Sequence, residues 1–379
     1  MSAAEALWVQ QAGAAGPRLL FLDPYLTHSH RAFLAGVLQY VPARWTALSL
    51  AGRHFRWRMR GAAAFLALAA GEILAGPWDG LVCTSMLALA ELRGLVPALA
   101  QVPAVAVFHE NQLAYPAPGA AGAGQQERDL YLAFQNLTTA LAARRVVFNS
   151  AYQRDEVLAA AATLLARLPD ARPPGLVEQV QAKSQVLPIP LDPAEAGDLV
   201  RGPRRGPLRL VWNHRWEHDK DPAALWEALF GLARSGRDFQ VAVLGPRPPR
   251  VDPGFAQAAH ELGPRLVHLG WAGDRREYWR WLFWADVGLS TARQEYFGLA
   301  LAEAVWAGCR PLAPATLVYP ELYPAELLYP PGALAAALEP LLAQPELARR
   351  ADYRPLAAGW TWPAQAAAWR EALTDFSAD

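Results

Sequence analysis

The chain of 379 residues lacks several features that would place it outside the cytoplasm. It has only two cysteines, Cys83 and Cys309, both in apolar segments, which excludes a disulfide framework and predicts buried free thiols in a reducing compartment. The longest apolar stretch, residues 62–70, is too short to cross a bilayer. Residues 1–16 have neither the basic start nor the long apolar run of a secretory signal. These absences predict a soluble cytoplasmic protein with no membrane partner.

The chain also lacks net charge, because its 35 Lys and Arg residues balance 35 Asp and Glu residues. A globally basic nucleic-acid binder is therefore excluded, but the charges are unevenly distributed. No acidic residue lies between Asp23 and Glu72, whereas six arginines do. These arginines are Arg31, Arg44, Arg53, Arg56, Arg58 and Arg60. This basic segment predicts a local surface for a polyanion.

Within the basic segment, cationic and apolar side chains alternate from His54 to Arg60. In an extended conformation this alternation would give one cationic face and one apolar face. The cationic face is expected to bind a polyanion, and aromatic neighbours could stack on unpaired bases. The alternative is an edge strand whose arginines only keep it soluble.

Short apolar runs alternate with alanine-rich amphipathic stretches in two successive βα series, which predicts an α/β protein. With 53% hydrophobic residues, the composition suffices for two cores. We expect domains at 17–190 and 206–358 and a final helical segment at 359–379, with a proline-rich linker after residue 187. Predicted strands lie at 18–22, 45–50, 80–84, 105–108, 145–149, 184–187, 208–212, 240–244, 266–269, 285–290 and 310–313, and predicted helices include 62–74, 127–143 and 363–376.

The most informative motif places Glu295 and Glu303 on either side of Gly298, with seven residues between them. The preceding apolar run predicts a strand, and residues 298–306 predict the helix that follows it. Glycine permits close backbone approach, and a helix start offers free N–H groups to an anion, so a phosphate site is expected. Glu295 is then placed to hold sugar hydroxyls and Glu303 a second diol such as a ribose. Taken alone, two glutamates around an apolar helix are also typical of a solvated face.

Two further patterns follow predicted strands. Arg215 and Lys220 lie just after strand 208–212, where ligands bind in open α/β sheets, and their charges suit a departing diphosphate. The alternative is a surface salt-bridge cluster with the neighbouring acidic residues. His109 ends strand 105–108 and is followed by Glu110, Asn111 and Gln112, a polar group typical of a cleft. A lone histidine that ends a strand is otherwise usually structural.

Together, a histidine from the first domain, an Arg/Lys pair from the second and the paired glutamates resemble the retaining GT-B glycosyltransferases. Five segments make the sequence similar to one branch of them, the tRNA-queuosine α-mannosyltransferases. These segments are 23–25 (DPY), 52–61 (GRHFRWRMRG), 109–113 (HENQL), 212–216 (WNHRW) and 319–322 (YPEL). One departure is Thr27-His28, where the wider superfamily has a glycine pair facing the donor phosphates.

The resemblance implies a GT-B fold with two Rossmann-like domains facing a central cleft and a C-terminal helix that crosses back to the first domain. It implies a retaining transfer of mannose from GDP-mannose to the cyclopentenediol of queuosine in tRNA(Asp), with no metal, no other cofactor and no obligate protein partner. The residues assigned by resemblance are His109, Arg215, Lys220 and Glu295 for catalysis; Arg215, Lys220, Glu295, Phe297, Gly298, Leu299 and Glu303 for the donor; and Arg53, Arg56, Arg58, Arg60, Asn111 and Gln112 for the tRNA.

Two alternatives remain open at this point. The same donor chemistry could serve a glycan or lipid acceptor, or the chain could be a non-catalytic module that binds a nucleotide sugar or RNA. The segment 115–126 is rich in Pro, Ala and Gly and is expected to form a mobile loop beside His109, with the character of a lid.

Overall fold

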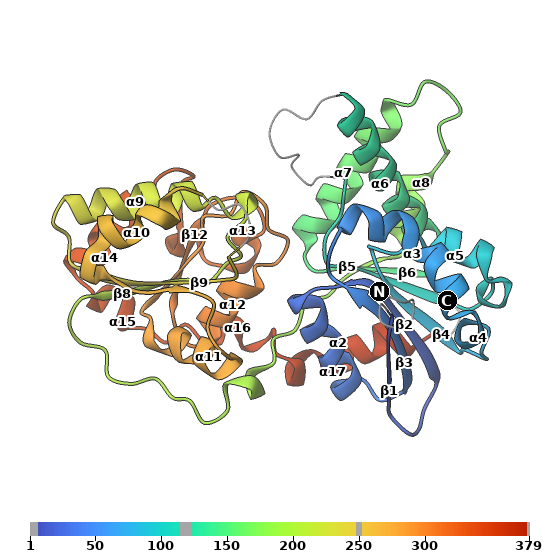
Figure 1. Ribbon diagram of the computed structural model, residues 1–379, viewed down its shortest axis with the longest axis horizontal. Helices are drawn as coiled ribbons and strands as arrows, with labels where there is room; N and C mark the ends of the chain where they lie inside the picture. Colours follow the sequence, from blue (N-terminus) through green and yellow to red (C-terminus); the bar gives the residue numbers. More distant parts are fainter. Residues whose placement is uncertain (1–6, 114–122, 248–251, 377–379) are drawn as a thin grey trace. The chain divides into compact units, whose positions relative to one another are not determined.

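The computed structural model describes residues 7–113, 123–247 and 252–376, with only the backbone of 123–129 (Figure 1). The chain forms two compact units, Met1–Pro190 with Gln365–Asp379, and Leu191–Ala364. Of the expected loop 115–126, residues 115–122 lie outside the described residues, whereas 123–126 belong to a helix. No helix in the described part of the chain has the length and apolar character needed to span a bilayer.

The first unit contains a seven-stranded sheet. Its strands are β1 (Leu7–Ala12), β2 (Arg18–Leu26), β3 (Arg44–Ala51), β4 (Gly80–Thr84), β5 (Ala104–Phe108), β6 (Arg145–Phe148) and β7 (Ser184–Val186), in the order β1-β3-β2-β4-β5-β6-β7. The pairs are parallel except for β1, which runs antiparallel to β3 with Leu7 opposite Leu50. The predicted strands are all present, and β1 is an additional edge strand.

Helices cover both faces of this sheet. They are α2 (His28–Tyr40), α3 (Phe55–Ala69), α4 (Gly71–Leu74), α5 (Leu89–Leu95), α6 (Ala123–Ala142), α7 (Ala151–Ala166), α8 (Leu176–Ala182) and α17 (Trp362–Thr374). Leu20 and Leu22 of β2 face the core cluster that includes α3, α5 and α6. Phe21, between them, contacts Phe33 of α2, with ring centroids 6.4 Å apart. Successive side chains of β2 therefore point to opposite faces of the sheet and are buried on both, as expected for a parallel strand.

The extended conformation expected for the basic segment is wrong, because α3 begins at Phe55 and includes Arg56, Arg58 and Arg60. The alternation of cationic and apolar side chains over seven residues fits a strand, but the burial of Met59 against its neighbours favours a helix. Met59 is fully buried and its carbonyl accepts a hydrogen bond from Gln135 of α6 at 3.0 Å. The arginines therefore lie around a helix rather than along one face of an edge strand.

The C-terminal helix α17 packs on the first unit, as the resemblance implies. Trp369 is fully buried, its ring lies 4.8 Å from that of Phe33, and its indole N–H donates to the carbonyl of Pro188 at 3.1 Å. Arg145 at the start of β6 donates to the carbonyl of Ala372 at 2.7 Å. In Figure 1, α17 and α2 lie side by side.

The second unit contains six parallel strands in the order β10-β9-β8-β11-β12-β13. They are β8 (Leu208–Trp212), β9 (Phe239–Leu244), β10 (Leu266–Gly270), β11 (Val287–Leu289), β12 (Arg310–Pro314) and β13 (Leu328–Tyr329). Along the chain this order is 3-2-1-4-5-6, that of a dinucleotide-binding sheet, and it reverses between β8 and β11. The short strand β13 was not among the predicted ones.

Helices cover both faces of the second sheet (Figure 1). They are α9 (Pro222–Arg234), α10 (Gly254–Leu262), α11 (Arg275–Trp284), α12 (Leu299–Trp306), α13 (Tyr319–Leu322), α14 (Leu334–Ala343), α15 (Glu346–Arg349) and α16 (Pro355–Ala358). Trp212 of β8 faces the core cluster with α9, α10 and α14. Its neighbour Val211 faces the cluster with α11 and α12. Both domains are thus Rossmann-like.

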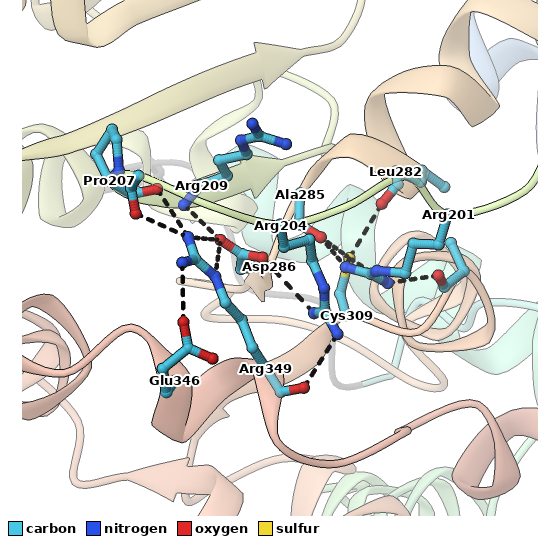
Figure 2. Close-up of polar contacts among 12 residues, drawn as sticks. Arg201, Arg204, Pro207, Arg209, Leu282, Ala285, Asp286, Cys309, Glu346 and Arg349 are labelled. Atoms are coloured by element: carbon cyan, nitrogen blue, oxygen red, sulfur yellow. Dashed lines mark hydrogen bonds and ion pairs between the residues drawn. The ribbon is translucent and has the colours of Figure 1, made fainter.

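The linker that follows Leu191 is fastened to the second unit by arginines around the buried carboxylate of Asp286 (Figure 2). Arg349 donates to Asp286 at 2.8 Å and also to the linker carbonyls of Gly206 and Pro207. Arg204 of the linker lies 3.6 Å from the same carboxylate. Nearby, Cys309 is a buried free thiol, as is Cys83 in the first unit, which confirms the prediction for both cysteines.

We predict that Asp286→Ala lowers the free energy of unfolding by about 3–5 kcal/mol, because it removes the buried carboxylate that pairs with Arg349 and leaves that cation only the exposed Glu346 at 3.4 Å. Urea unfolding of the purified variant measures this change. A matched control is Asp198→Ala, which removes an exposed carboxylate from its ion pair with Arg276 and should leave stability nearly unchanged. Equal stability of the two variants would contradict the assignment.

Candidate functional site

The loops that follow β8 and β11 lie where the strand order of the second sheet reverses, and they carry the predicted donor residues. Lys220, in the 3-10 turn His218–Lys220, has its Nζ 3.1 Å from Oε2 of Glu295 and 3.1 Å from Oδ2 of Asp219. The same ammonium donates to the carbonyl of Gln294 at 2.8 Å. The structure therefore brings Lys220 and Glu295 into direct contact across 75 residues of sequence.

This ion pair is largely buried, with side chains 10% exposed for Lys220 and 17% for Glu295. Burial disfavours the charged forms of both side chains, but the attraction between the opposite charges has the larger effect. The carboxylates of Glu295 and Asp219 raise the pKa of Lys220, and Lys220 in turn lowers the pKa of Glu295. Burial, with Lys220 nearby, lowers the pKa of His214 to about 4. At neutral pH the site thus has a fixed ammonium, fixed carboxylates and a neutral imidazole.

Arg215 lies near Asp219, as Lys220 does, but its side chain is more exposed. Its guanidinium is 4.0 Å from Asp219 and 3.4 Å from Glu217, and its side chain is 51% exposed. The surface salt-bridge interpretation therefore describes the contact between Arg215 and Glu217 but is wrong for Lys220, which is buried. An accessible guanidinium next to an anchored ammonium can receive a doubly charged diphosphate.

Gly298 forms the N-terminal cap of α12 in a left-handed conformation, with φ of 82°. A Cβ added there would lie 3.3 Å from the ring of Tyr319, so both backbone and space favour glycine. No side chain among the described residues caps the helix start, so its first N–H groups suit an anion. Phe297 is buried against Trp360, with ring centroids 5.4 Å apart, so only its main chain suits a donor contact. Leu299 begins the helix.

Glu303 is held in a separate group of contacts. Its carboxylate accepts hydrogen bonds from Tyr278 at 2.5 Å and from Arg275 at 2.8 Å, both from α11. Asn213, just after β8, donates to Tyr278 at 2.8 Å and to the carbonyl of Ala300 at 2.6 Å, which connects this group to the loop of Lys220. Sequence reasoning missed Asn213, Tyr278 and Arg275. Of these three, only Asn213 is indicated by a local pattern, because it is a polar residue directly after a buried strand.

In the first unit, His109 follows β5 and is 8% exposed. Its ring lies close to those of His30 and Phe33 of α2, with centroid distances of 4.5 and 4.7 Å. Neither ring nitrogen has a hydrogen-bond partner among the described residues. A buried imidazole without partners is unusual for a structural histidine and fits a group that awaits a ligand.

His30 is the second group that sequence reasoning missed. Its Nδ1 lies 2.8 Å from Asp23 and its Nε2 lies 3.3 Å from Glu110. Burial opposes charge on this ring, but the two carboxylates outweigh it and raise the pKa of His30 to about 10. Burial, with the charge of His30, lowers the pKa of His109 to about 3. A cationic His30 thus lies against a neutral His109. The signal in the sequence was Asp23, which ends the apolar run of β2.

The predicted acceptor residues also lie in the first unit. Asn111 is buried, and its side-chain oxygen accepts from the backbone of Leu113 at 3.0 Å, while the backbone of Gln112 donates to Asn136 at 2.8 Å. These bonds fix the turn after His109. Of the basic residues, Arg53 is exposed, and Arg56, Arg58 and Arg60 are half-buried around α3.

We predict that the stabilising contribution of His30 decreases at alkaline pH. Its folded pKa of about 10 exceeds the unfolded value of 6.5, so the contribution is complete below about pH 6.5 and is lost as the pH rises through 10. The difference in unfolding free energy between the wild type and His30→Gln should therefore shrink over this range in urea titrations. His260→Gln, at an exposed histidine, is the control. A difference independent of pH would refute the assignment.

Comparisons with known proteins agree with this fold. Solved structures show the same fold at low identity. Trehalose-6-phosphate synthase OtsA has a TM-score of 0.69 at 14% identity, covering 95% of this chain and 99% of its own. Sucrose-phosphate synthase from Thermosynechococcus elongatus has a TM-score of 0.61 at 15% identity, covering 93% and 97%. The fold is therefore GT-B.

Sequence comparisons identify the family. Residues 18–191 match the model of the tRNA-queuosine alpha-mannosyltransferase N-terminal domain. A tRNA-queuosine alpha-mannosyltransferase from Drosophila melanogaster is 33% identical over 324 residues, which cover 83% of this chain and 84% of the fly protein. The chain is a glycosyltransferase and belongs to the tRNA-queuosine alpha-mannosyltransferase family.

Proposed function

We propose that this protein transfers mannose from GDP-mannose to the cyclopentenediol of queuosine in tRNA(Asp), with retention of the anomeric configuration. The observation that carries the donor half of this proposal is the ammonium of Lys220, anchored 3.1 Å from Glu295 and bordered by Arg215 at the switch point of the second sheet. The acceptor half rests on the family and on the name of the fly relative.

In the proposed reaction, the bond between the sugar C1 and the diphosphate oxygen breaks, and an acceptor hydroxyl forms the new C1–O bond on the same face. The departing phosphate takes the hydroxyl proton, so no protein nucleophile is required. Lys220 and Arg215 neutralise the negative charge that grows on the diphosphate, and the start of α12 adds N–H donors. This part of the catalysis is electrostatic, and the charges are in place before the donor binds.

The remaining residues position the sugars. We assign Glu295 to hydroxyls of the hexose, because one of its oxygens is held by Lys220 and the carboxylate can still accept from a sugar. Glu303 is assigned to the ribose, with Tyr278 and Arg275 holding its orientation. His109 is assigned to the transferred sugar. Its neutral ring can share a hydrogen bond with a hydroxyl without adding a charge that would oppose an oxocarbenium-like centre.

We further propose that the reaction needs no metal ion, since Arg215 and Lys220 supply the positive charge that a divalent ion supplies elsewhere. The protein is proposed to act in the cytoplasm, a reducing compartment that suits its two buried free cysteines.

We predict that Lys220→Ala lowers the rate of hexose transfer by about 100- to 1000-fold, because the leaving diphosphate loses a positioned cation. Lys183→Ala is a matched control, since Lys183 lies in the other unit and donates to the carbonyls of Leu141 and Ala143. The measurements are single-turnover transfer, GDP affinity and thermal unfolding. Near-wild-type transfer in folded Lys220→Ala would eliminate the diphosphate assignment.

The donor and acceptor are tested together by incubating the protein with GDP-mannose or UDP-glucose and with queuosine-containing or queuosine-free tRNA. Digestion to nucleosides and mass measurement should show one added hexose only with GDP-mannose and only on queuosine. The product should form equally in the presence of EDTA. Hexose addition that ignores queuosine would refute the acceptor, and preference for UDP-glucose would refute the donor.

A further inference from the structure

Trp57 differs from most tryptophans of the chain. The indoles of Trp45, Trp212, Trp279, Trp362 and Trp369 are among the largest fully buried side chains, whereas Trp57 is 68% exposed. It lies in the first turn of α3, within the basic segment. An exposed indole offers a large, rigid aromatic surface to a ligand, and whether it is used as a binding contact is judged from its surroundings.

The ring of Trp57 packs against its own helix, α3. A Cβ added to Gly61, one helical turn later, would lie 3.3 Å from Cε2 and Cζ2 of the indole. The absence of a side chain at Gly61 therefore lets the indole lie against α3 while most of its surface stays in water. This contact limits the motion of the ring, so less conformational entropy is lost when a ligand binds it.

The residues around Trp57 indicate which class of ligand would bind there. Arg56 and Arg60 lie one turn apart on the same helix, and the guanidinium of Arg60 is 5.7 Å from the ring of Tyr131, which is 60% exposed. Arg53 precedes the helix and is also exposed. Exposed aromatic rings interspersed with arginines are the combination that binds single-stranded nucleic acid, through stacking on bases and contacts to phosphates.

The same end of α3 is connected to His109 through a series of side-chain contacts. Met59 of α3 shares an apolar cluster with Tyr25, the residue after Pro24 at the end of β2. The ring of Tyr25 lies 6.4 Å from that of His30, which lies 4.5 Å from that of His109. Helix α3, which carries Trp57, is thus connected through these contacts to the carboxyl ends of β2 and β5, after which the candidate acceptor residues Asn111 and Gln112 follow.

We infer that Trp57 is a stacking platform for an unpaired base of the tRNA acceptor, with Arg56 and Arg60 holding the adjacent phosphates. This inference rests on the proposed function. It adds a contact in which the protein recognises the tRNA by stacking on a base, in addition to the arginine contacts with phosphates. Stacking on one base gives affinity with little dependence on salt, whereas each phosphate contact contributes to the salt dependence.

The test compares tRNA affinity at several salt concentrations for the wild type, Trp57→Ala, Trp57→Phe and Arg56→Gln. Trp57→Ala should weaken binding about 5- to 100-fold at every salt concentration, with an unchanged log–log slope. Trp57→Phe should keep most of the affinity. Arg56→Gln should reduce the slope by about one unit. Trp271→Ala, at the 55% exposed tryptophan of the second unit, is the control.

The outcomes separate the inference from the proposed function. If the wild type transfers hexose to queuosine in tRNA but Trp57→Ala binds tRNA as tightly as the wild type, the stacking role is wrong and the proposed function stands. A loss of affinity in Trp57→Ala that comes only with a smaller salt slope also contradicts stacking. If the wild type does not bind tRNA, both proposals fail together.

Discussion

The buried ammonium of Lys220 is the constraint on which the donor half of the structure depends. A charge at this depth is stable only when carboxylates and a carbonyl surround it, and the chain supplies them from loops 75 residues apart. Further bonds join the same loops. The backbone of Arg293 donates to the carbonyl of Asp219 at 2.8 Å, and Thr291 donates to the carbonyl of Lys220 at 2.7 Å. The site and the switch point of the sheet are therefore stabilised by the same contacts.

The first unit repeats this arrangement with different groups. His30 is a buried cation held by two carboxylates, and it too lies at the carboxyl ends of parallel strands, next to the neutral His109. In each unit a positive charge that is present at neutral pH is fixed by pairing, and a group suited to a ligand lies beside it. Such preorganised charge costs little reorganisation during a reaction, which suits a transfer in which the leaving group changes charge.

The sequence predicted most strands because buried parallel strands are short apolar runs. It indicated Lys220 and Glu295 as candidate donor residues because both follow such runs, but it did not indicate their contact. It failed where the pattern was ambiguous or the contact was distant. Alternation around Met59 fitted a strand as well as a helix, and only the burial of Met59 in tertiary structure decides between them. The contact of Glu303 with Tyr278 and that of His30 with Glu110 join separate elements, so no local pattern indicates them.

The most direct test of this account is a crystal structure of the protein with GDP bound. The account predicts that oxygens of the diphosphate lie at hydrogen-bond distance, about 3 Å, from Nζ of Lys220 and from the guanidinium of Arg215, at the start of α12. The ribose hydroxyls are expected at Glu303. A diphosphate bound elsewhere, with Lys220 contacting only Glu295 and Asp219, would contradict the central claim and leave this ion pair a purely structural one.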